Sequence, residues 1–182
     1  NSETLKTELT GAGNPSLALE SLSRMQGFDT SASHTAYVDA QNSLKVLRII
    51  KNKHKENWQT FLKTSTKPSV ETILKSDGIY SIFENVKGRN MMYLVSTLHP
   101  NACFHPSYNS WGYLWDCRRD PEPLLNLPIN QLRDVLKKMS PKALRVLKTN
   151  KAPVVLDKKF ARKQKPYTDL DIETIKKRAH LV

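Results

Sequence analysis

Residues 78–98, GIYSIFENVKGRNMMYLVSTL, decide the fold class of this 182-residue chain. Apolar and aromatic side chains dominate residues 79–83, Lys87-Gly88 supplies a turn, and a second apolar run covers residues 91–98. Two runs of β-favouring side chains on either side of a glycine-containing turn predict a β-hairpin. We therefore expect an antiparallel sheet to begin here.

Downstream of the hairpin, the pattern of apolar residues and turn-forming residues predicts more strands and two helices. The expected elements are a strand at residues 111–116, a helix at 130–139, two strands at 145–148 and 154–156, and a helix from Asp169. This part of the chain therefore predicts a small antiparallel sheet or barrel with one inserted helix.

Upstream of the hairpin, the sequence is helical. A helix is expected near residues 16–26, with Ser16 as its cap, and residues 1–13 are expected to be a loose end. Apolar residues then recur every three or four positions across 34–52, which predicts the longest helix. Another helix is expected around Trp58, ending where residues 66–68 break the pattern.

The charge of the chain is strongly basic. It has 29 Lys or Arg and 17 Asp or Glu, a net charge of +12, with an isoelectric point near 9.7. Residues 133–182 alone contain 15 basic and 5 acidic side chains, a net +10. Such a field favours polyanions such as nucleic acid or anionic lipid.

Apolar runs are far shorter than the roughly 20 residues that a membrane span needs, and no charged-then-apolar signal opens the chain. We therefore expect a soluble, cytoplasmic protein that does not contact membranes. Cys103 and Cys117 are the two cysteines, too few for a disulfide framework. They are expected to be reduced, half-buried thiols.

The sharpest chemical motif is HTAYVD, from His34 to Asp39, which has the His-x-Ala-x-x-Asp pattern of DEDDh exonucleases. A histidine at the mouth of a helix can take a proton from water near neutral pH, and a carboxylate one turn later can hold a divalent cation. Taken alone, the pattern fits equally well a solvated histidine with a capping aspartate.

Beyond this motif, the chain resembles bacterial exonuclease I over nearly its whole length. Five segments carry the resemblance: residues 15–20 with the following Gly27, residues 78–85, residues 91–98 followed by His99-Pro100, Trp115-Asp116 before residues 124–127, and Asn150-Lys151-Ala152-Pro153-Val154, which is similar to the family's Asn-Lys-Cys-Pro-Val. These segments extend well past the nuclease motif.

The resemblance implies an α+β chain in three parts. Residues 1–67 would be the C-terminal helices of a ribonuclease H-like exonuclease domain, and residues 68–156 an SH3-like antiparallel β domain. Residues 157–182 would be a basic linker and the start of a helical domain. The implied activity is 3′→5′ hydrolysis of single-stranded DNA with Mg²⁺, in which His34 is the general base and Asp39 a metal ligand.

The chain departs from the family upstream of His34. The family's Asp-x-Glu motif and second aspartate should precede this histidine, yet the 33 residues before it contain neither. The first motif has a local sequence match further along the chain, at Asp171-Ile172-Glu173-Thr174. We interpret this match as the acidic first turn of a helix. We expect the chain alone to be inactive, and the missing N-terminal part of the exonuclease domain to be a partner.

Two surfaces are candidates for binding. Lys158, Lys159, Arg162, Lys163 and Lys165, with the rings of Phe160 and Tyr167, would suit single-stranded DNA, or would form a solvated linker. Trp111, Tyr113 and Trp115 alternate along one strand, which favours a packed sheet face over a base platform. The resemblance also implies binding of the C-terminal tail of single-stranded DNA-binding protein.

Two non-enzymatic hypotheses compete with the nuclease. The chain could be a non-catalytic module that binds single-stranded nucleic acid or a protein peptide, or an unrelated SH3-like adaptor. A zinc site built from His99, His105, Cys103 and Cys117 is disfavoured, because their spacing matches no common ligand pattern.

Overall fold

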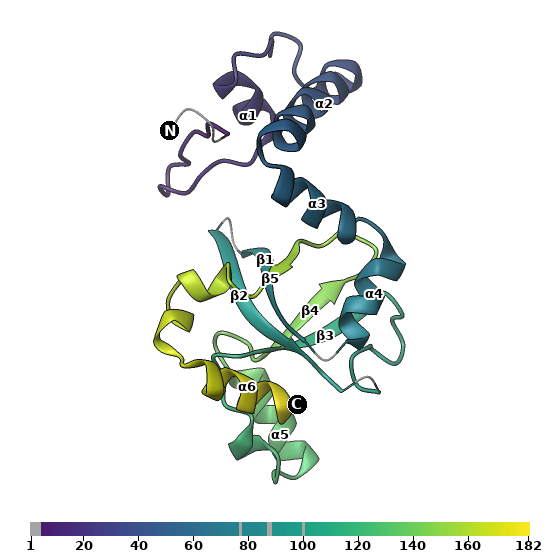
Figure 1. Cartoon of the computed structure of the whole chain (residues 1–182), viewed down its shortest axis with the longest axis vertical. Helices are drawn as coiled ribbons and strands as arrows, with labels where there is room; N and C mark the ends of the chain where they lie inside the picture. Colours follow the sequence, from purple (N-terminus) through teal and green to yellow (C-terminus); the bar gives the residue numbers. More distant parts are fainter. Residues whose placement is uncertain (1–4, 77, 87–88, 100) are drawn as a thin grey trace. The chain divides into compact units, whose positions relative to one another are not determined.

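The computed structural model describes residues 5–76, 78–86, 89–99 and 101–182. Its contacts divide the chain into two compact units, Asn1–Thr60 and Phe61–Val182. The first unit is helical and the second combines an antiparallel sheet with helices (Figure 1). The mixture of helix and antiparallel sheet agrees with the predicted α+β class. The domain identities, and the boundaries at residues 67 and 156, stay predictions.

The helical unit is built on two helices, α1 (Leu19–Met25) and α2 (Ala36–Lys53), which contact each other. Helix α2 is the long helix predicted from the apolar spacing. The next helix, α3 (Lys55–Lys63), contains Trp58 as expected and spans the division between the two units.

The described segment before α1, residues 5–18, is held by backbone contacts, which corrects two expectations. Leu9 and Pro15 form an antiparallel bridge, and the Ser16 amide donates to the Glu8 carbonyl at 2.7 Å. Ser16 is therefore held in extended structure and does not cap the helix, which begins at Leu19 after Ala18. Residues 5–13, the described part of the predicted loose end, are therefore anchored by this bridge and by backbone hydrogen bonds.

Glu8 also ties this segment to α1 through its side chain. Its carboxylate accepts hydrogen bonds from Arg24 Nε and Nη2, both at 2.8 Å, and from Ser21 Oγ at 2.9 Å. These donors, Arg24 first, lower the pKa of Glu8 from 4.5 to about 2. A group with a lowered folded pKa contributes stability above its unfolded pKa, and this contribution is lost as pH falls.

We therefore expect the helical unit to lose the contribution of Glu8 between about pH 4.5 and about pH 2. An NMR titration of the Glu8 carboxyl carbon, with helicity followed in parallel, measures this directly. Glu8→Gln should remove the acid-sensitive step. A Glu8 midpoint near 4.5 would show that the Arg24 contact does not form in solution.

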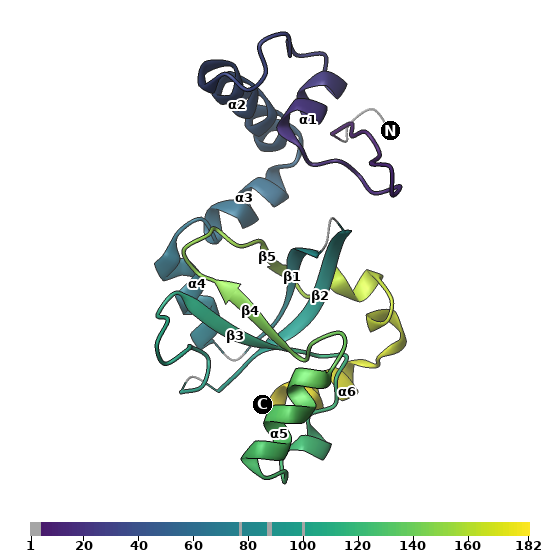
Figure 2. The same cartoon turned by 180° about the vertical axis from the view of Figure 1, so that it is seen from behind.

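In the second unit, the described strands form one five-stranded sheet in the order β4-β3-β2-β1-β5, in which every neighbouring pair is antiparallel (Figures 1 and 2). The strands are β1 (Ile79–Val86), β2 (Arg89–Thr97), β3 (Trp111–Asp116), β4 (Leu144–Lys148) and β5 (Val155–Asp157). The predicted hairpin is confirmed, since β1 pairs with β2 from Ile79↔Ser96 to Val86↔Arg89. The predicted turn at Lys87-Gly88 lies outside the described residues.

Helix α4 (Lys67–Lys75) was missed by the sequence analysis. Residues 66–68 were expected to end a helix, but they begin one. The Thr66 side chain accepts from the Ser69 amide, and Pro68 occupies the first turn, where a missing N–H costs nothing. Helix α4 packs against β3 (Figure 1) and buries Val70 and Leu74 completely.

One face of the sheet packs against α4 to form the main core. This cluster takes two side chains from the helix, two from β2 and one from each of the other four strands: Val70, Leu74, Ile82, Tyr93, Val95, Leu114, Leu147 and Val155. The close approach of α4 depends on Gly112 in β3, because a Cβ at this position would overlap Leu74 Cδ1. Gly112 therefore sets the distance between helix and sheet.

Gly112→Ala is expected to lower the free energy of unfolding by about 1–3 kcal/mol, the usual cost of overfilling a packed core. Urea unfolding monitored by circular dichroism measures the loss. Because the added methyl meets the end of Leu74, the double variant Gly112→Ala, Leu74→Val should recover part of it. No loss in the single variant would mean that α4 is loosely packed.

Over β1 and β2, the other face of the sheet is covered by the C-terminal segment. Leu94, Cys117, Ala161, Tyr167 and Ile175 form a second buried cluster. The covering elements are two short turns, η2 (Ala161–Lys163) and η3 (Tyr167–Asp169), and helix α6 (Ile172–His180). Residues 157–182 therefore pack on the sheet within the second unit, and Tyr167, 1% exposed, is not available for base stacking as had been considered.

A third cluster joins Trp115, Leu124 and Ala143 to helix α5 (Ile129–Lys138) next to the turn η1 (Glu122–Leu124). Helices α5 and α6 lie close together beyond one end of the sheet (Figures 1 and 2). Cys103 and Cys117 are reduced and fully buried, so the expectation of half-buried thiols is wrong. Among the described helices, none is long and apolar enough to cross a membrane.

Candidate active-site segment and nucleic-acid surface

His34 and Asp39 lie where the sequence predicted, at the start of α2. His34 has a left-handed backbone with φ of 76°, rare for a side chain other than glycine and a source of local strain. Its amide donates to Asp39 Oδ1 at 3.3 Å, so the aspartate fixes this turn. The His34 side chain is 83% exposed, which leaves the imidazole open to water and to a substrate.

Glu20 on α1 is a third group beside them, and no sequence pattern pointed to it. Glu20 Oε2 lies 3.6 Å from His34 Nε2, and Glu20 Oε1 lies 3.4 Å from Arg24. Arg24 in turn binds Glu8. A chain of side-chain contacts therefore links the N-terminal segment to the imidazole, and a carboxylate beside one ring nitrogen can orient the ring.

A divalent metal centre does not fit the described residues by themselves. Mg²⁺ prefers six oxygen ligands in octahedral geometry, and Asp39 has one oxygen engaged with the His34 amide. Across the described part of the chain, no group of three or more His, Cys, Asp or Glu side chains could hold a metal ion. Asp39 can therefore act as one ligand of a shared site, which needs carboxylates from elsewhere.

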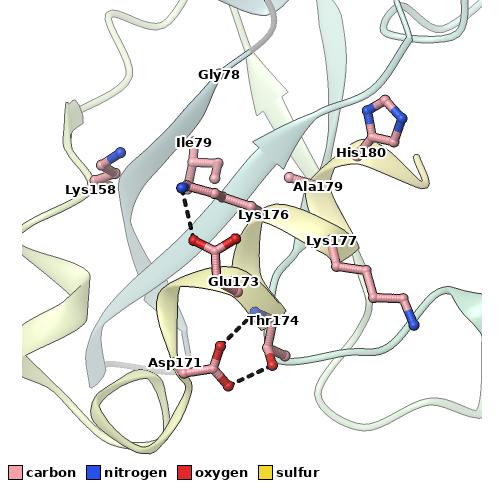
Figure 3. A pocket seen from close by; sticks show the side chains of 10 residues that line it. All are labelled: Gly78, Ile79, Lys158, Asp171, Glu173, Thr174, Lys176, Lys177, Ala179 and His180. Carbon is pink, nitrogen blue, oxygen red and sulfur yellow. Dashed lines mark hydrogen bonds and ion pairs between the residues drawn. The ribbon is translucent and has the colours of Figure 1, made fainter.

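The Asp171–Thr174 segment forms the start of helix α6, in agreement with the predicted acidic first turn. Asp171 is the N-cap of α6, and its carboxylate accepts from Thr174 N at 2.7 Å and Thr174 Oγ1 at 2.6 Å, which lowers its pKa (Figure 3). Glu173 pairs with Lys176 at 2.9 Å. These carboxylates border an open pocket of about 900 Å³, whose rim also carries Lys158 and His180 (Figure 3).

The five basic residues predicted to contact DNA form an ordered turn. The Ala161 amide donates to Ser81 Oγ in β1 at 2.9 Å, which fixes the turn to the sheet. Ala161 is buried, whereas the neighbouring cations are exposed or half-buried. We call Lys158, Lys159, Arg162, Lys163 and Lys165 the basic turn. An ordered backbone with outward cations suits phosphate binding better than a free linker does.

Over 98% of its length, the chain superposes on 40% of exonuclease I from Methylocaldum szegediense, with a TM-score of 0.70 and 21% identity. This chain has the fold of that part of exonuclease I. It superposes equally well on E. coli exonuclease I in complex with a dT13 oligonucleotide, with a TM-score of 0.70 and 18% identity over 98% of this chain and 40% of that one.

A complex of exonuclease I with the SSB C-terminal segment (SSB-Ct) matches with a TM-score of 0.66 and 17% identity, over 98% of this chain and 40% of that one. The chain thus spans about 40% of the exonuclease I chains that it matches. No protein-family model matches the sequence, and the comparison with curated proteins gives no match.

Within this exonuclease I-like fold, a buried ionic network holds the C-terminal segment to the sheet. Asp116 at the end of β3 is fully buried and accepts from Arg118 Nε at 2.8 Å, Arg118 Nη2 at 2.7 Å and the Tyr167 hydroxyl at 2.8 Å. Arg145 lies 3.6 Å from Asp116 and 3.3 Å from Glu84. Burial, followed by the charge of Asp116, raises the pKa of Tyr167, so its hydroxyl stays a donor.

Proposed function

We propose that this chain is part of an exodeoxyribonuclease I-like enzyme, which removes nucleotides from the 3′ end of single-stranded DNA, and that it binds the strand without cleaving it when alone. One observation carries the proposal: a fold shared over 98% of the chain with 40% of exonuclease I, together with His34-x-Ala-x-x-Asp39 at the start of α2. The exposed imidazole of His34 supports the same role.

In the complete enzyme, His34 is the general base that takes a proton from the attacking water, and Glu20 orients its ring. Asp39 contributes one ligand to a Mg²⁺ site whose other carboxylates belong to an upstream exonuclease segment. When bound, the metal supplies charge stabilisation at the scissile phosphate. The residues of this chain supply the base, its orientation and one ligand.

The basic turn provides sequence-independent affinity for single-stranded DNA through its phosphates. The partner implied by the SSB-Ct complex is the acidic tail of single-stranded DNA-binding protein. The pocket beside α6 supports this second partner, because Ile79 and Ala179 give it apolar walls and its three lysines, Lys158, Lys176 and Lys177, outnumber its two carboxylates, Asp171 and Glu173 (Figure 3). We place the enzyme in the cytoplasm, where both partners are available.

Binding and cleavage measured side by side test the proposal. The isolated chain should bind oligo-dT with an affinity that falls steeply between about 50 and 200 mM salt, and should not shorten it when Mg²⁺ is added. The double variant Lys163→Gln, Lys165→Gln should bind more weakly with a smaller salt slope. The double variant Lys137→Gln, Lys138→Gln, at the end of α5, serves as the charge-matched control. Absence of binding, or metal-dependent shortening by the isolated chain, would contradict the proposal.

A second candidate is a non-catalytic binding module for single-stranded nucleic acid. The observation in its favour is that the described residues include a well-ordered basic turn for binding phosphates, but no metal-binding group beyond the single motif carboxylate, Asp39. The two candidates differ when an upstream exonuclease segment is supplied. Cleavage then appears if the chain belongs to an enzyme, whereas a module binds DNA unchanged.

A further inference from the structure

The loop between β2 and β3 is folded back onto the sheet, in a fixed conformation, over residues 103–111. The Tyr113 amide donates to the Cys103 carbonyl at 2.7 Å, and the His105 amide donates to the Trp111 carbonyl at 2.9 Å. His105 Nδ1 accepts from the amides of Ser107 and Tyr108 at 3.0 and 3.2 Å. The loop is therefore held before any ligand arrives, so that little ordering entropy remains to be lost on binding.

Four rings gather on this loop and the adjoining strand. His105 lies at the centre, with ring centroids 4.6 Å from Tyr108, 5.9 Å from Trp111 and 5.9 Å from Tyr113. Tyr108 and Trp111 are 4.9 Å apart with their planes tilted by 33°. We call His105, Tyr108, Trp111 and Tyr113 the aromatic platform.

The platform lies on the side of β3 away from the main core. Side chains alternate along a strand, and Gly112 and Leu114 face α4, so Trp111 and Tyr113 point to the opposite side. Tyr108 is 54% exposed, and Val146, paired with Tyr113 in the next strand, is 41% exposed. Four aromatic rings thus meet at a partly open surface that the core does not require.

The charge around the platform is positive. Lys148, paired with Trp111 in the sheet, places its Nζ 5.5 Å from the centre of the indole ring. Residues 99–115 and 144–156 contain no acidic side chain, and Lys151 adds an exposed cation at the end of β4. Partly exposed rings beside cations are complementary to a strand that carries both bases and phosphates.

We propose that the aromatic platform is a stacking site for the bases of single-stranded DNA, with Lys148 binding an adjacent phosphate. The proposal rests on the single-strand binding proposed above and adds to it a contact independent of the basic turn. Stacking tolerates any base, because each one has a π-face, which suits an enzyme that acts along a strand of any sequence. The site distinguishes a single strand from a duplex, whose bases are already stacked.

Binding of the full 182-residue chain to two fluorescent ligands tests the platform. One ligand is a short oligo-dT and the other is an abasic strand with the same number of phosphates, both in EDTA. Tyr108→Ala and Trp111→Leu should each weaken oligo-dT binding by about 5- to 100-fold and leave abasic binding unchanged. Lys148→Gln should weaken the binding of both ligands and reduce the slope of log affinity against log salt concentration by about 0.7. Leu125→Ala, whose side chain is 53% exposed, is the matched surface control.

The possible outcomes are distinct. If the wild-type chain binds oligo-dT and both ring variants bind it equally well, the platform is not a stacking site, while the proposed function stands. If the wild-type chain binds neither ligand, both proposals are wrong. If sedimentation shows a dimer that Tyr108→Ala dissociates with DNA binding intact, the platform is a face for self-association. Quenching of Trp111 fluorescence by oligo-dT, absent in Trp111→Leu, adds direct support.

Discussion

Replacing His34 by alanine in the enzyme completed with its upstream exonuclease segment is expected to slow hydrolysis of single-stranded DNA by about 100- to 10,000-fold, the usual range for losing a general base. The imidazole is 83% exposed at the mouth of α2, next to Asp39 and within 3.6 Å of Glu20. Removing it leaves the attacking water with no group to take its proton. Single-turnover degradation of an oligonucleotide in Mg²⁺ measures the effect.

Added imidazole should restore part of the rate of His34→Ala, which a purely structural role would not allow. His180→Ala, on the exposed end of α6, is the matched histidine control and should hydrolyse free oligonucleotide at the wild-type rate. The assignment of His34 as the base is wrong if His34→Ala keeps the wild-type rate.

Replacing Asp116 by alanine is expected to lower the free energy of unfolding of the second unit by about 3–5 kcal/mol, because breaking a buried ion pair leaves its partner uncompensated. Asp116 is fully buried and binds Arg118 and the Tyr167 hydroxyl, with Arg145 at 3.6 Å. The cations of Arg118 and Arg145 would remain beside the ring of Tyr93, where Arg145 keeps its contact with Glu84. Urea unfolding monitored by circular dichroism measures the loss.

Tyr167→Phe removes a single neutral donor from the same carboxylate and should cost about 1 kcal/mol. Asp134→Ala, on the exposed side of α5, should change stability by less than about 0.5 kcal/mol. If Asp116→Ala were as mild as Asp134→Ala, water would have to reach the network, and the C-terminal segment would not be anchored through Tyr167.

Elements with a strong local pattern were predictable from the sequence. The β1–β2 hairpin follows from two β-favouring runs around a turn, and α2 follows from apolar residues spaced three or four apart. Helix α4 was missed although its signal was present. Thr66 followed by Pro68 is typical of a helix start, and Val70, Ile73 and Leu74 lie on one helical face.

Contacts between distant segments could not be predicted in this way. Tyr167 lies in a lysine-rich stretch that locally resembles a solvated linker, and its burial depends on Asp116 in β3. The same holds for the candidate site. Its pattern placed His34 and Asp39 at the start of a helix, but the approach of Glu20 depends on how α1 packs on α2.

The aromatic platform combines a feature that the sequence predicts with one that it does not. The alternation of Trp111 and Tyr113 is visible in the sequence, and alternating aromatic residues on a strand most often belong to a packed sheet face. Trp115 follows that expectation, being 5% exposed and packed near Leu124. The folding back of the loop carries His105 and Tyr108 to the other two rings, and no local pattern encodes this.

Complementation tests the central claim most directly. Shortening of a 3′-ended oligonucleotide in Mg²⁺ is measured for this chain alone, for an upstream exonuclease segment alone, and for the two combined. We predict cleavage from the 3′ end only in the combination, and its loss when the chain carries Asp39→Ala. Cleavage by this chain alone, or a combination that binds single-stranded DNA and never shortens it, would contradict the account.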